Sequence, residues 1–326
     1  MSAPAPLRVV PADEIDRALT FPGLVDALEG AFRGAIVAPV RHHHEIARPD
    51  GDATLLLMPA WTGPAEGATA SAADGSAVGV KIVSVFPGNG AKGLPAVQGV
   101  YYLADGETGA PRAVLDGARL TLWRTACASA LAARHLARAG ATEMVMVGAG
   151  ALAPFLIRAH ASQRPIARVT IWNRDPARAR ALAARLAGEG LPVAASEDLE
   201  AAVRRADLVS CATLARSPLV RGEWLREGVH LDLVGAFNLA MREADDAALQ
   251  RASVFVDTPA ALTEGGDVAV AIRDGGIARE HVRGDLFGLC RGEVSGRARD
   301  GEITVFKSVG AALEDLAAAM AVMRGL

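Results

Sequence analysis

The sequence predicts an α/β protein, with a doubly wound parallel sheet in the second part of the chain and an α+β domain before it. Three observations support this prediction. The apolar run 144–147 breaks into a Gly-x-Gly-x-x-Ala turn, strand and helix patterns alternate after the turn, and about 140 residues precede it, which is enough for a separate domain. We place the first domain at 1–120 plus 303–326 and the second at 121–302.

The Gly-x-Gly-x-x-Ala segment has the chemistry of a dinucleotide-binding turn. Gly148 permits the tight reversal from strand to helix, Gly150 lets the backbone approach a pyrophosphate, and the small Ala153 lets the helix lie close to the strand. The phosphate would lie at the helix N-terminus, where free N–H groups and the helix dipole favour an anion. The pattern therefore predicts a Rossmann-type domain.

The segments after the turn alternate at the spacing of a parallel sheet. Strands are expected at 168–172, 192–194, 207–211, 230–234 and 253–256, and helices at 177–187, 198–205 and 245–250. We take 253–256 as the last strand of this sheet. The segment 303–310 and the helix expected after it at 311–323 are expected to return to the first domain, and the acidic segment 264–267 is expected to form a turn.

The first domain combines two helices with a group of strands. Helices are expected at 13–19 and 23–35, strands at 41–46, 54–58, 79–85, 97–103 and 112–115, and turns at 49–51, 87–90 and 105–109. Because no long helix separates these strands, their sheet should be antiparallel or mixed. A helix at 118–139 leads into the dinucleotide turn, and the Gly-, Ala- and Ser-rich segment 63–76 is expected to be a surface loop.

The composition is that of a soluble globular protein, with 51% hydrophobic and 22% charged residues. The net charge of −3 offers no basic surface for nucleic acid or an anionic membrane, and no window of about 18 apolar residues predicts a membrane helix. The first residues lack a signal-peptide pattern, and three cysteines without a Cys-x-x-Cys pair favour the cytoplasm. His42, His43 and His44 would point to alternate faces of a strand, so no metal site is expected.

Lysine is rare in this chain. Lys81, Lys92 and Lys307 are the only lysines among 34 basic residues, so arginine is the default surface cation. A lysine kept in such a chain points to a need for an amine that can release its proton near neutral pH. For Lys92, which lies beside Gly-rich turns, chance is the preferred explanation.

Several stretches together resemble the ornithine cyclodeaminase/μ-crystallin family. They follow the family's order over nearly the whole chain, at 79–81, 93–95, 120–126, 147–151, 206–213 and 306–310. The resemblance implies a homodimer whose N-terminal domain binds the substrate and carries the dimer contact. It also implies an NAD(P)-binding domain and chemistry on an imine or an amino acid.

The same resemblance assigns site residues. The family's contacts to the substrate carboxylate match Arg41, Lys81 and Arg124, and a solvated surface is the alternative for the two arginines. A small carboxylate held away from water needs a planar two-pronged donor and a second cation. The family's nucleotide contacts match Ala151, Leu152, Asn173, Thr213, Val234, Gly235 and Ser308. Leu152 replaces the family's common glutamine, so only a backbone contact is expected there.

The segment after the fifth strand of the nucleotide fold indicates which of the family's reactions is expected. The family's cyclodeaminases carry Gly-Gly-Asp-Cys-Pro-Gly-Lys there, and the aspartate acts as acid and base on the amine. Here Phe237 takes the aspartate's place and Met241 the lysine's, and a phenyl ring cannot transfer a proton. Asp232, Glu243 and Asp245 are acids at nearby positions, but none matches the motif. The Gly-Ala-Phe form resembles the family's imine reductases.

The residues at the end of the second strand of the nucleotide fold indicate which of the two nicotinamide cofactors, NADH or NADPH, is expected. An acid there accepts the ribose hydroxyls of NAD and repels the 2′-phosphate of NADP. Asn173 is neutral, Arg174 offers a phosphate-binding fork, and Arg178 follows one turn later. Asp175 before Pro176 is expected to cap the next helix. We therefore expect NADPH, with NADH as the alternative; a solvated loop charge is the other interpretation of Arg174.

Together these features predict reduction of a cyclic imino acid, Δ1-pyrroline-2-carboxylate or Δ1-piperideine-2-carboxylate, to L-proline or L-pipecolate. Arg41, Lys81 and Arg124 would hold the carboxylate. Lys81 is the candidate proton donor to the imine, unless the substrate arrives protonated. Phe237 and Met58 would form an apolar wall or lie in the core. The alternatives are an amino-acid dehydrogenase of the alanine dehydrogenase type, an ornithine cyclodeaminase, and a μ-crystallin-like NADPH-dependent ligand binder.

Overall fold

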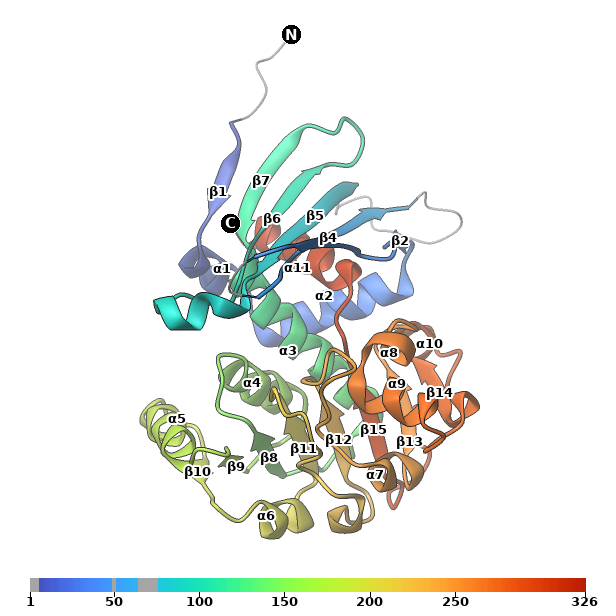
Figure 1. The fold of residues 1–326 in the computed structure, drawn as a ribbon. Helices are drawn as coiled ribbons and strands as arrows, with labels where there is room; N and C mark the ends of the chain where they lie inside the picture. Colours follow the sequence, from blue (N-terminus) through green and yellow to red (C-terminus); the bar gives the residue numbers. More distant parts are fainter. Residues whose placement is uncertain (1–5, 49–50, 64–75) are drawn as a thin grey trace. The chain divides into compact units, whose positions relative to one another are not determined.

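The computed structural model describes residues 6–48, 51–63 and 76–326 (Figure 1). The expected turn at 49–51 and the expected surface loop at 63–76 therefore lie largely outside the described residues. Among the residues that are described, none of the helices combines the length and the apolar character needed to cross a lipid bilayer.

The chain divides into two compact units. The first holds Met1–Arg124 and Ala311–Leu326, and the second holds Thr125–Gly310. One division falls inside helix α3 (Gly117–Leu136), a few residues after the expected boundary. The other falls after residue 310 rather than 302, because strand β15 (Thr304–Lys307) belongs to the sheet of the second unit. The expectation that this strand returns to the first unit is therefore wrong.

The first unit is built on a mixed sheet, as its short turns predicted. Its described strands are β1 (Arg8–Val10), β2 (Ile36–Val37), β3 (His42–Ile46), β4 (Ala53–Thr62), β5 (Ala77–Val85), β6 (Val97–Asp105) and β7 (Pro111–Asp116). Their order is β1-β7-β6-β5-β4-β2, with β3 also paired to β4. β1 runs parallel to β7, and the other pairs are antiparallel.

Helices cover one face of this sheet. They are α1 (Ala12–Ala18), α2 (Phe21–Arg33), the start of α3 and α11 (Ala312–Gly325). α2 begins at a Thr20 cap and buries a stripe of apolar residues, which an amphipathic helix turns toward the core. α11 is rich in alanine and contacts α2, β4, β5 and β6. In β5, Lys81 and Val83 are buried while Ile82 between them is exposed, so alternate residues face the helices.

The second unit is a doubly wound sheet, as predicted. Its described strands are β8 (Glu143–Val147), β9 (Arg168–Trp172), β10 (Val193–Ala195), β11 (Leu208–Cys211), β12 (His230–Leu233), β13 (Ser253–Val256), β14 (Val282–Asp285) and β15. Their order is β10-β9-β8-β11-β12-β15-β13-β14, and every pair is parallel. The chain passes from β8 to β9 on one side and later to β11 on the other. This reversal of strand order is where such folds bind their ligands.

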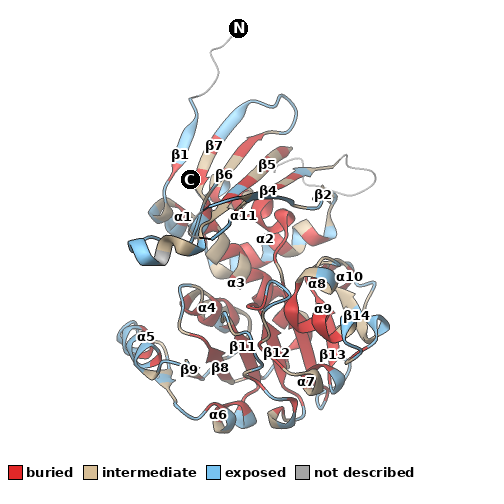
Figure 2. Ribbon diagram, in the orientation of Figure 1, coloured by how far each residue is buried: buried red, intermediate tan, exposed pale blue. Residues whose placement is uncertain are grey.

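Two strands of this sheet escaped the sequence analysis. β15 lies between β12 and β13 and is fully buried, as Figure 2 shows for the central strands. The segment 253–256 is therefore not the last strand of the sheet. β14, at the edge, contains an arginine, a glycine and an aspartate in four residues, so it carries no apolar pattern that identifies a strand.

The described helices of the second unit are α4 (Ala153–Gln163), α5 (Pro176–Gly188), α6 (Leu199–Arg205), α7 (Asp246–Gln250), α8 (Ala261–Glu264), α9 (Gly266–Arg273) and α10 (Leu286–Arg291). Aspartate side chains cap α5, α6, α7 and α10, and the cap of α5 is Asp175, as expected. Asp175 accepts a hydrogen bond from Ala177 N, and Asp245 from Ala248 N. The expected turn at 264–267 is wrong, because α8 ends there and α9 begins at once.

Candidate functional site

The first unit buries a cluster of four charged side chains. Lys81 Nζ lies 2.9 Å from Asp315 Oδ1 and 2.8 Å from Asp315 Oδ2. Arg124 donates from Nε to Asp315 Oδ1 at 3.1 Å and from Nη1 to Glu314 Oε2 at 2.8 Å. Lys81 and Arg124 are only 3% and 6% exposed, and the two carboxylates are fully buried. The cluster holds as many cations as anions, which is the condition for burying charges at tolerable cost.

Three elements position these side chains. Lys81 lies in the middle of β5, where it pairs with Met58 of β4 and Tyr101 of β6. Arg124 comes from α3, and both carboxylates come from the first turn of α11. The unpaired N–H groups of a helix N-terminus favour negative charge, so the first turn is a suitable place for buried carboxylates.

The surroundings of Lys81 bring the pKa of its ammonium group close to neutral pH. Burial and the neighbouring Arg124 lower the pKa of Lys81 to about 8, although Asp315 and Glu314 act in the opposite direction. Tyr101 beside it is fully buried, and burial raises the pKa of its hydroxyl. Lys81 can therefore hold or release a proton near neutral pH, whereas Tyr101 stays protonated.

The structure brings together two of the three predicted carboxylate-binding residues. Lys81 and Arg124 share Asp315. Arg41 directly precedes β3, is partly buried, and is separated from β5 by β4 in the sheet.

The sequence analysis missed Glu314 and Asp315. Their signal was a pair of acids in the first turn of a helix that is apolar up to Arg324 in its last turn, and acids buried in such a helix need cations as partners.

In the second unit, the carboxyl ends of four strands lie in register. Val147 of β8 pairs with Cys211, Cys211 with Leu233, and Leu233 with Lys307. The turns that follow these strands therefore lie at one edge of the sheet. They contain the predicted nucleotide contacts Gly148, Gly150, Ala151, Leu152, Thr213, Val234, Gly235 and Ser308. We call this edge the nucleotide edge.

The two glycines of the first turn have different surroundings. Gly148 has a φ of +116°, and a Cβ there would lie 2.6 Å from Ala212 O. Gly150 is exposed, and a Cβ there would meet nothing within 4 Å. The first glycine is thus required by the fold, and the second leaves open space at the start of α4, where Leu152 is the capping residue. This is the arrangement that a pyrophosphate needs.

The residues that follow β9 leave no carboxylate available to a ribose. Asn173 bonds the backbone, accepting from Ala149 N at 3.3 Å and donating to Asp175 O at 3.0 Å. The Asp175 carboxylate caps α5. Arg174 and Arg178 are exposed, and the guanidinium of neither has a hydrogen-bond or ion-pair partner among the described residues.

A second buried charge cluster bonds to the other turns of the nucleotide edge. It consists of Glu243, Asp267 and Lys307. All three are fully buried. Glu243 Oε1 accepts from Thr213 N at 2.6 Å and from Thr213 Oγ1 at 2.8 Å. Lys307 donates to Gly235 O and lies 3.3 Å from Asp267 Oδ2. We call these three residues the turn cluster. The sequence analysis had named Lys307 as one of three lysines, Asp267 as part of an expected turn and Glu243 as an acid that does not match the family motif, but it had not connected them.

Further residues of this edge differ in exposure. The Ser308 hydroxyl is buried without a hydrogen-bond partner among the described residues, so it can bond a ligand. Phe237 is 51% exposed, which excludes the core interpretation, whereas Met58 in the first unit is buried. Asp232 is buried and bonded by Ser129, Ser210 and His160, so it serves the core of this unit.

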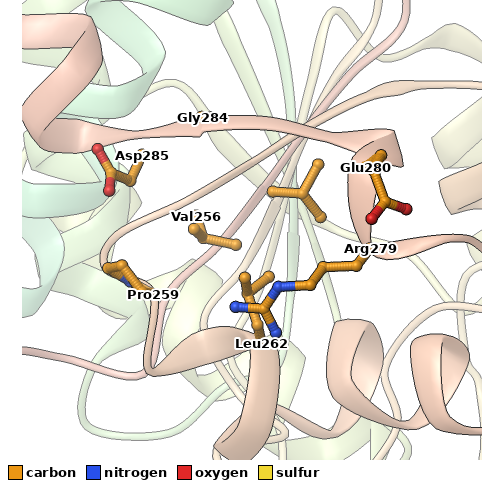
Figure 3. Close-up of a pocket in the computed structure, with 8 residues that line it drawn as sticks. Val256, Pro259, Leu262, Arg279, Glu280, Gly284 and Asp285 are labelled. Atoms are coloured by element: carbon orange, nitrogen blue, oxygen red, sulfur yellow. The ribbon is translucent and has the colours of Figure 1, made fainter.

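A separate cavity of about 310 Å³ lies beside β13 and β14. Val256, Pro259, Leu262, Arg279, Glu280, Val282, Gly284 and Asp285 line it, and Figure 3 shows the Arg279 side chain extending over Leu262. None of the predicted nucleotide contacts lines this cavity. His42, His43 and His44 are exposed on β3, and the described residues contain no group of three or more side chains suited to a metal ion.

The fold and these clusters define a class of protein: a Rossmann-type dinucleotide-binding unit joined to a unit that buries two cations against two carboxylates. The chain belongs to the ornithine cyclodeaminase/mu-crystallin family, whose model matches residues 9–325. The resemblance found in the sequence is thus confirmed.

Named relatives narrow the comparison. The chain is 42% identical over 301 residues to the Δ1-pyrroline-2-carboxylate reductase of Paracoccus denitrificans, with 92% of each chain covered. It is similar to the structure of Thermococcus litoralis Δ1-pyrroline-2-carboxylate reductase in complex with NADH and L-proline, at 30% identity and a TM-score of 0.89 over 98% of this chain and 97% of that one. It is also similar to an archaeal alanine dehydrogenase dimer with bound NAD, at 29% identity and a TM-score of 0.86 over 98% and 95%.

Proposed function

We propose that the protein reduces a cyclic imino acid, Δ1-pyrroline-2-carboxylate or Δ1-piperideine-2-carboxylate, to L-proline or L-pipecolate, with NADPH preferred over NADH. The observation that carries this proposal is the buried pair Lys81 and Arg124, in which the lysine has a pKa of about 8. Relatives named Δ1-pyrroline-2-carboxylate reductase, one of them in complex with NADH and L-proline, support it.

The charge balance of the cluster suits such a substrate. Lys81 and Arg124 are matched by Glu314 and Asp315. A cyclic imino acid with a protonated ring nitrogen and an ionised carboxylate carries no net charge, so it adds no uncompensated charge to a buried site. Its carboxylate suits the planar guanidinium of Arg124 and the ammonium of Lys81. Arg41 is proposed as the third carboxylate contact.

Lys81 is the proposed proton donor. An iminium is a better hydride acceptor than a neutral imine, so a proton must be on the ring nitrogen when reduction occurs. A lysine with the ordinary pKa of 10.5 would release its proton too reluctantly near pH 7, whereas Lys81 at about 8 is suited to the transfer. The exposed ring of Phe237 stands where the family's cyclodeaminases carry their acid, and it is proposed as an apolar contact for the ring methylenes.

A bound nicotinamide cofactor would supply the hydride. Gly148, Gly150 and the start of α4 fit its pyrophosphate, because Gly150 leaves open space beside the backbone. Thr213, Val234, Gly235 and Ser308 would hold the rest of the nucleotide through the turns of the nucleotide edge. Among these, the buried hydroxyl of Ser308 is the side chain whose hydrogen-bonding capacity is unused within the described residues.

NADPH is the proposed cofactor because two exposed arginines follow β9 and no free carboxylate does. We expect Arg174→Ala and Arg178→Ala each to raise the Kd of NADPH by about tenfold, since each removes a charge-assisted hydrogen bond to the 2′-phosphate, and to leave the Kd of NADH unchanged. Arg180→Ala is the matched control, because Arg180 lies on the same helix and pairs with Glu197. A wild-type protein that binds NADH more tightly than NADPH would refute this preference.

We also propose a homodimer formed through the first unit. Leu57, Ile82 and Val100 lie side by side on β4, β5 and β6, on the face opposite to the one that carries the buried Lys81 and Val83. Ile82 and Val100 are 39% and 42% exposed. Such an apolar sheet face needs a partner surface, and a family member similar to this chain is an alanine dehydrogenase dimer.

The proposed location is the cytoplasm. All three cysteines, Cys127, Cys211 and Cys290, are buried as thiols rather than in disulfides, which fits a reducing compartment. Burial raises the pKa of Cys127 and Cys211, so both are inert thiols.

A substrate panel tests the proposed reaction. Oxidation of NADPH and of NADH is followed with each cyclic imine, with pyruvate plus ammonium, and without substrate, and ammonia release from L-ornithine is followed with NAD. Fast turnover of a cyclic imine supports the proposal. Turnover of pyruvate plus ammonium, without turnover of either cyclic imine, would identify an alanine dehydrogenase. Release of ammonia from L-ornithine would identify a cyclodeaminase. Tight ligand binding without turnover of any imine would identify a binding protein.

A further inference from the structure

The turn cluster contains one cation and two carboxyl groups in a fully buried place. Lys307 is the only partner cation within it, and Glu243 and Asp267 both face it. Arg242 lies nearby, with Nε 4.0 Å from Asp267 Oδ1, and Cys211 of β11 faces Glu243 as a neutral thiol. Arg242 already pairs with Asp246 at 2.6 Å, so a second negative charge in the turn cluster would have no cation of its own, which is costly in a buried site.

The bonds of the turn cluster reach each of the turns beside the dinucleotide turn. Glu243 fixes Thr213, after β11, through its backbone N–H and its hydroxyl. Lys307 donates to Leu233 O at 3.2 Å and to Gly235 O, at the end of β12. Asp267 Oδ1 accepts from Glu243 N at 2.7 Å, which ties the two carboxyl-bearing segments to each other.

The turn after β12 also needs to be held. Ala236 has a φ of +48°, a left-handed conformation that costs free energy in a residue other than glycine, and it is fully buried. Its carbonyl accepts from Gly266 N at 2.7 Å, the residue before Asp267. A Cβ at Gly266 would collide with Asn238 O and Met241 O, so only glycine fits. Strain of this kind persists where surrounding bonds enforce it, and it concentrates at functional sites.

We propose that Lys307, Asp267 and Glu243 are positioning residues that hold the turns after β11 and β12 in the form that binds the dinucleotide, and that Glu243 carries a proton in this state. The inference rests on the proposed binding of a nicotinamide dinucleotide. The proton belongs on Glu243 Oε2, because this oxygen is buried without a hydrogen-bond partner among the described residues, while Oε1 accepts two hydrogen bonds from Thr213.

The geometry agrees with the titration of Glu243. Burial and the neighbouring Asp267 raise the pKa of Glu243 to about 8 against the opposing effect of Lys307. Below about pH 8 the group is therefore neutral, and above it a buried negative charge appears beside Thr213 and Gly235. Because the dinucleotide is itself an anion, its affinity should fall as this charge forms.

The test measures the Kd of NADH by fluorescence between pH 6.5 and 9.5, without substrate. NADH is the probe because it lacks a 2′-phosphate that would titrate. For the wild type, Kd should rise by about tenfold or more above pH 8. For Glu243→Gln, which keeps an acceptor for Thr213 but cannot ionise, Kd at pH 7 should stay within about threefold of wild type and the alkaline rise should disappear. An alkaline rise that persists in Glu243→Gln overturns the inference.

A second pair of variants separates positioning from folding. Lys307→Met leaves Asp267 without its cation, so both thermal stability and NADH affinity should fall. Lys307→Met/Asp267→Asn removes both charges, so stability should recover while Kd remains at least about tenfold above wild type, since the bonds to Leu233 O and Gly235 O are still missing. Recovery of both properties would show a merely structural role. A wild-type protein that binds neither NADH nor NADPH would instead refute the proposed function.

Discussion

Two of the three lysines in this chain are buried in the same manner, each from a strand against an aspartate in the first turn of a helix. Lys81 of β5 faces Asp315 of α11, and Lys307 of β15 faces Asp267 of α9. The helix N-terminus favours the ionised aspartate, and the aspartate in turn makes a buried ammonium tolerable. Each lysine is thereby fixed in position by an aspartate.

The sequence could identify the lysines but not their partners. The scarcity of lysine singled out Lys81, and the family resemblance added Arg124. Asp315 lies in a helix that has the composition of a core element, and Asp267 lies in a Gly-rich segment that was expected to be a turn. Lys81 and Asp315 are 234 positions apart in the chain, so no local pattern connects them. Which cation meets a buried acid is decided by the tertiary fold.

The pH dependence of turnover tests Lys81 as the proton donor. Because its pKa is about 8, the donating form is present below that pH, and kcat at saturating cyclic imine should fall above it. Lys81→Arg keeps a cation for the carboxylate but cannot donate near neutral pH. It should lower kcat by about 100-fold or more, change KM little, and remove the loss centred near pH 8. Wild-type turnover in Lys81→Ala would rule out the donor role.

The unfolding free energy of Asp315→Asn tests the buried cluster. Removing this carboxylate leaves Lys81 and Arg124 with Glu314 alone, and breaking a buried pair of this kind costs about 3–5 kcal/mol. Denaturant unfolding should show this loss. Asp13→Asn is the control: Asp13 pairs with Arg17 on the surface of α1, so little change is expected. Equal free energies of unfolding for Asp315→Asn and Asp13→Asn would contradict the ion pairing described for the buried cluster.

At the scale of elements, the turn from β8 to α4 contains one glycine that the fold requires and another that leaves space for a ligand. Gly148 adopts a left-handed conformation beneath Ala212, whereas Gly150 borders open space. The sequence predicted the tight reversal at Gly148 correctly, because a short motif fixes it locally, whereas the contact of Gly150 with a pyrophosphate stays a prediction. It placed the regular strands and helices well for the same reason, but it missed β14, whose polar edge sequence lacks a periodic pattern.

Substitutions in this turn should divide accordingly. Gly148→Ala forces both a strained φ and a collision with Ala212 O, so it should lower thermal stability and nucleotide affinity together. Gly150→Val places its side chain in open space, so stability should stay near wild type while the Kd of NADPH rises by about tenfold or more. Thermal melts and fluorescence titrations check both variants. A Gly150→Val protein with wild-type affinity would show that the pyrophosphate lies elsewhere.

At the scale of the whole molecule, the two units differ in what the sequence revealed about them. The second was visible from its strand–helix alternation, except for β15, which follows β14 after 18 residues and completes the middle of the sheet. In the first unit, strand alternation predicts that every second residue faces away from the helices. Whether these residues join into one apolar face depends on the register of neighbouring strands, which no sequence pattern indicated.

Molecular mass in solution tests the proposed assembly. The wild type should have the mass of a dimer by light scattering, and Ile82→Asp should shift it toward the monomer, because a charge in the middle of a buried apolar interface is strongly unfavourable. Leu214→Asp is the control, since Leu214 is 72% exposed on the second unit. A monomeric wild type, or a dimer that survives Ile82→Asp, would refute this interface.

The position of α11 has a consequence for the order in which the molecule is made. Synthesis proceeds from the N-terminus, so Lys81 and Arg124 leave the ribosome long before Glu314 and Asp315. The segment 125–310 is complete at a time when the earlier unit still lacks the helix that contacts β4, β5 and β6. Of the two units, the one whose translation starts earlier is therefore the later to close, because Lys81 and Arg124 meet their carboxylates only after α11 has been made.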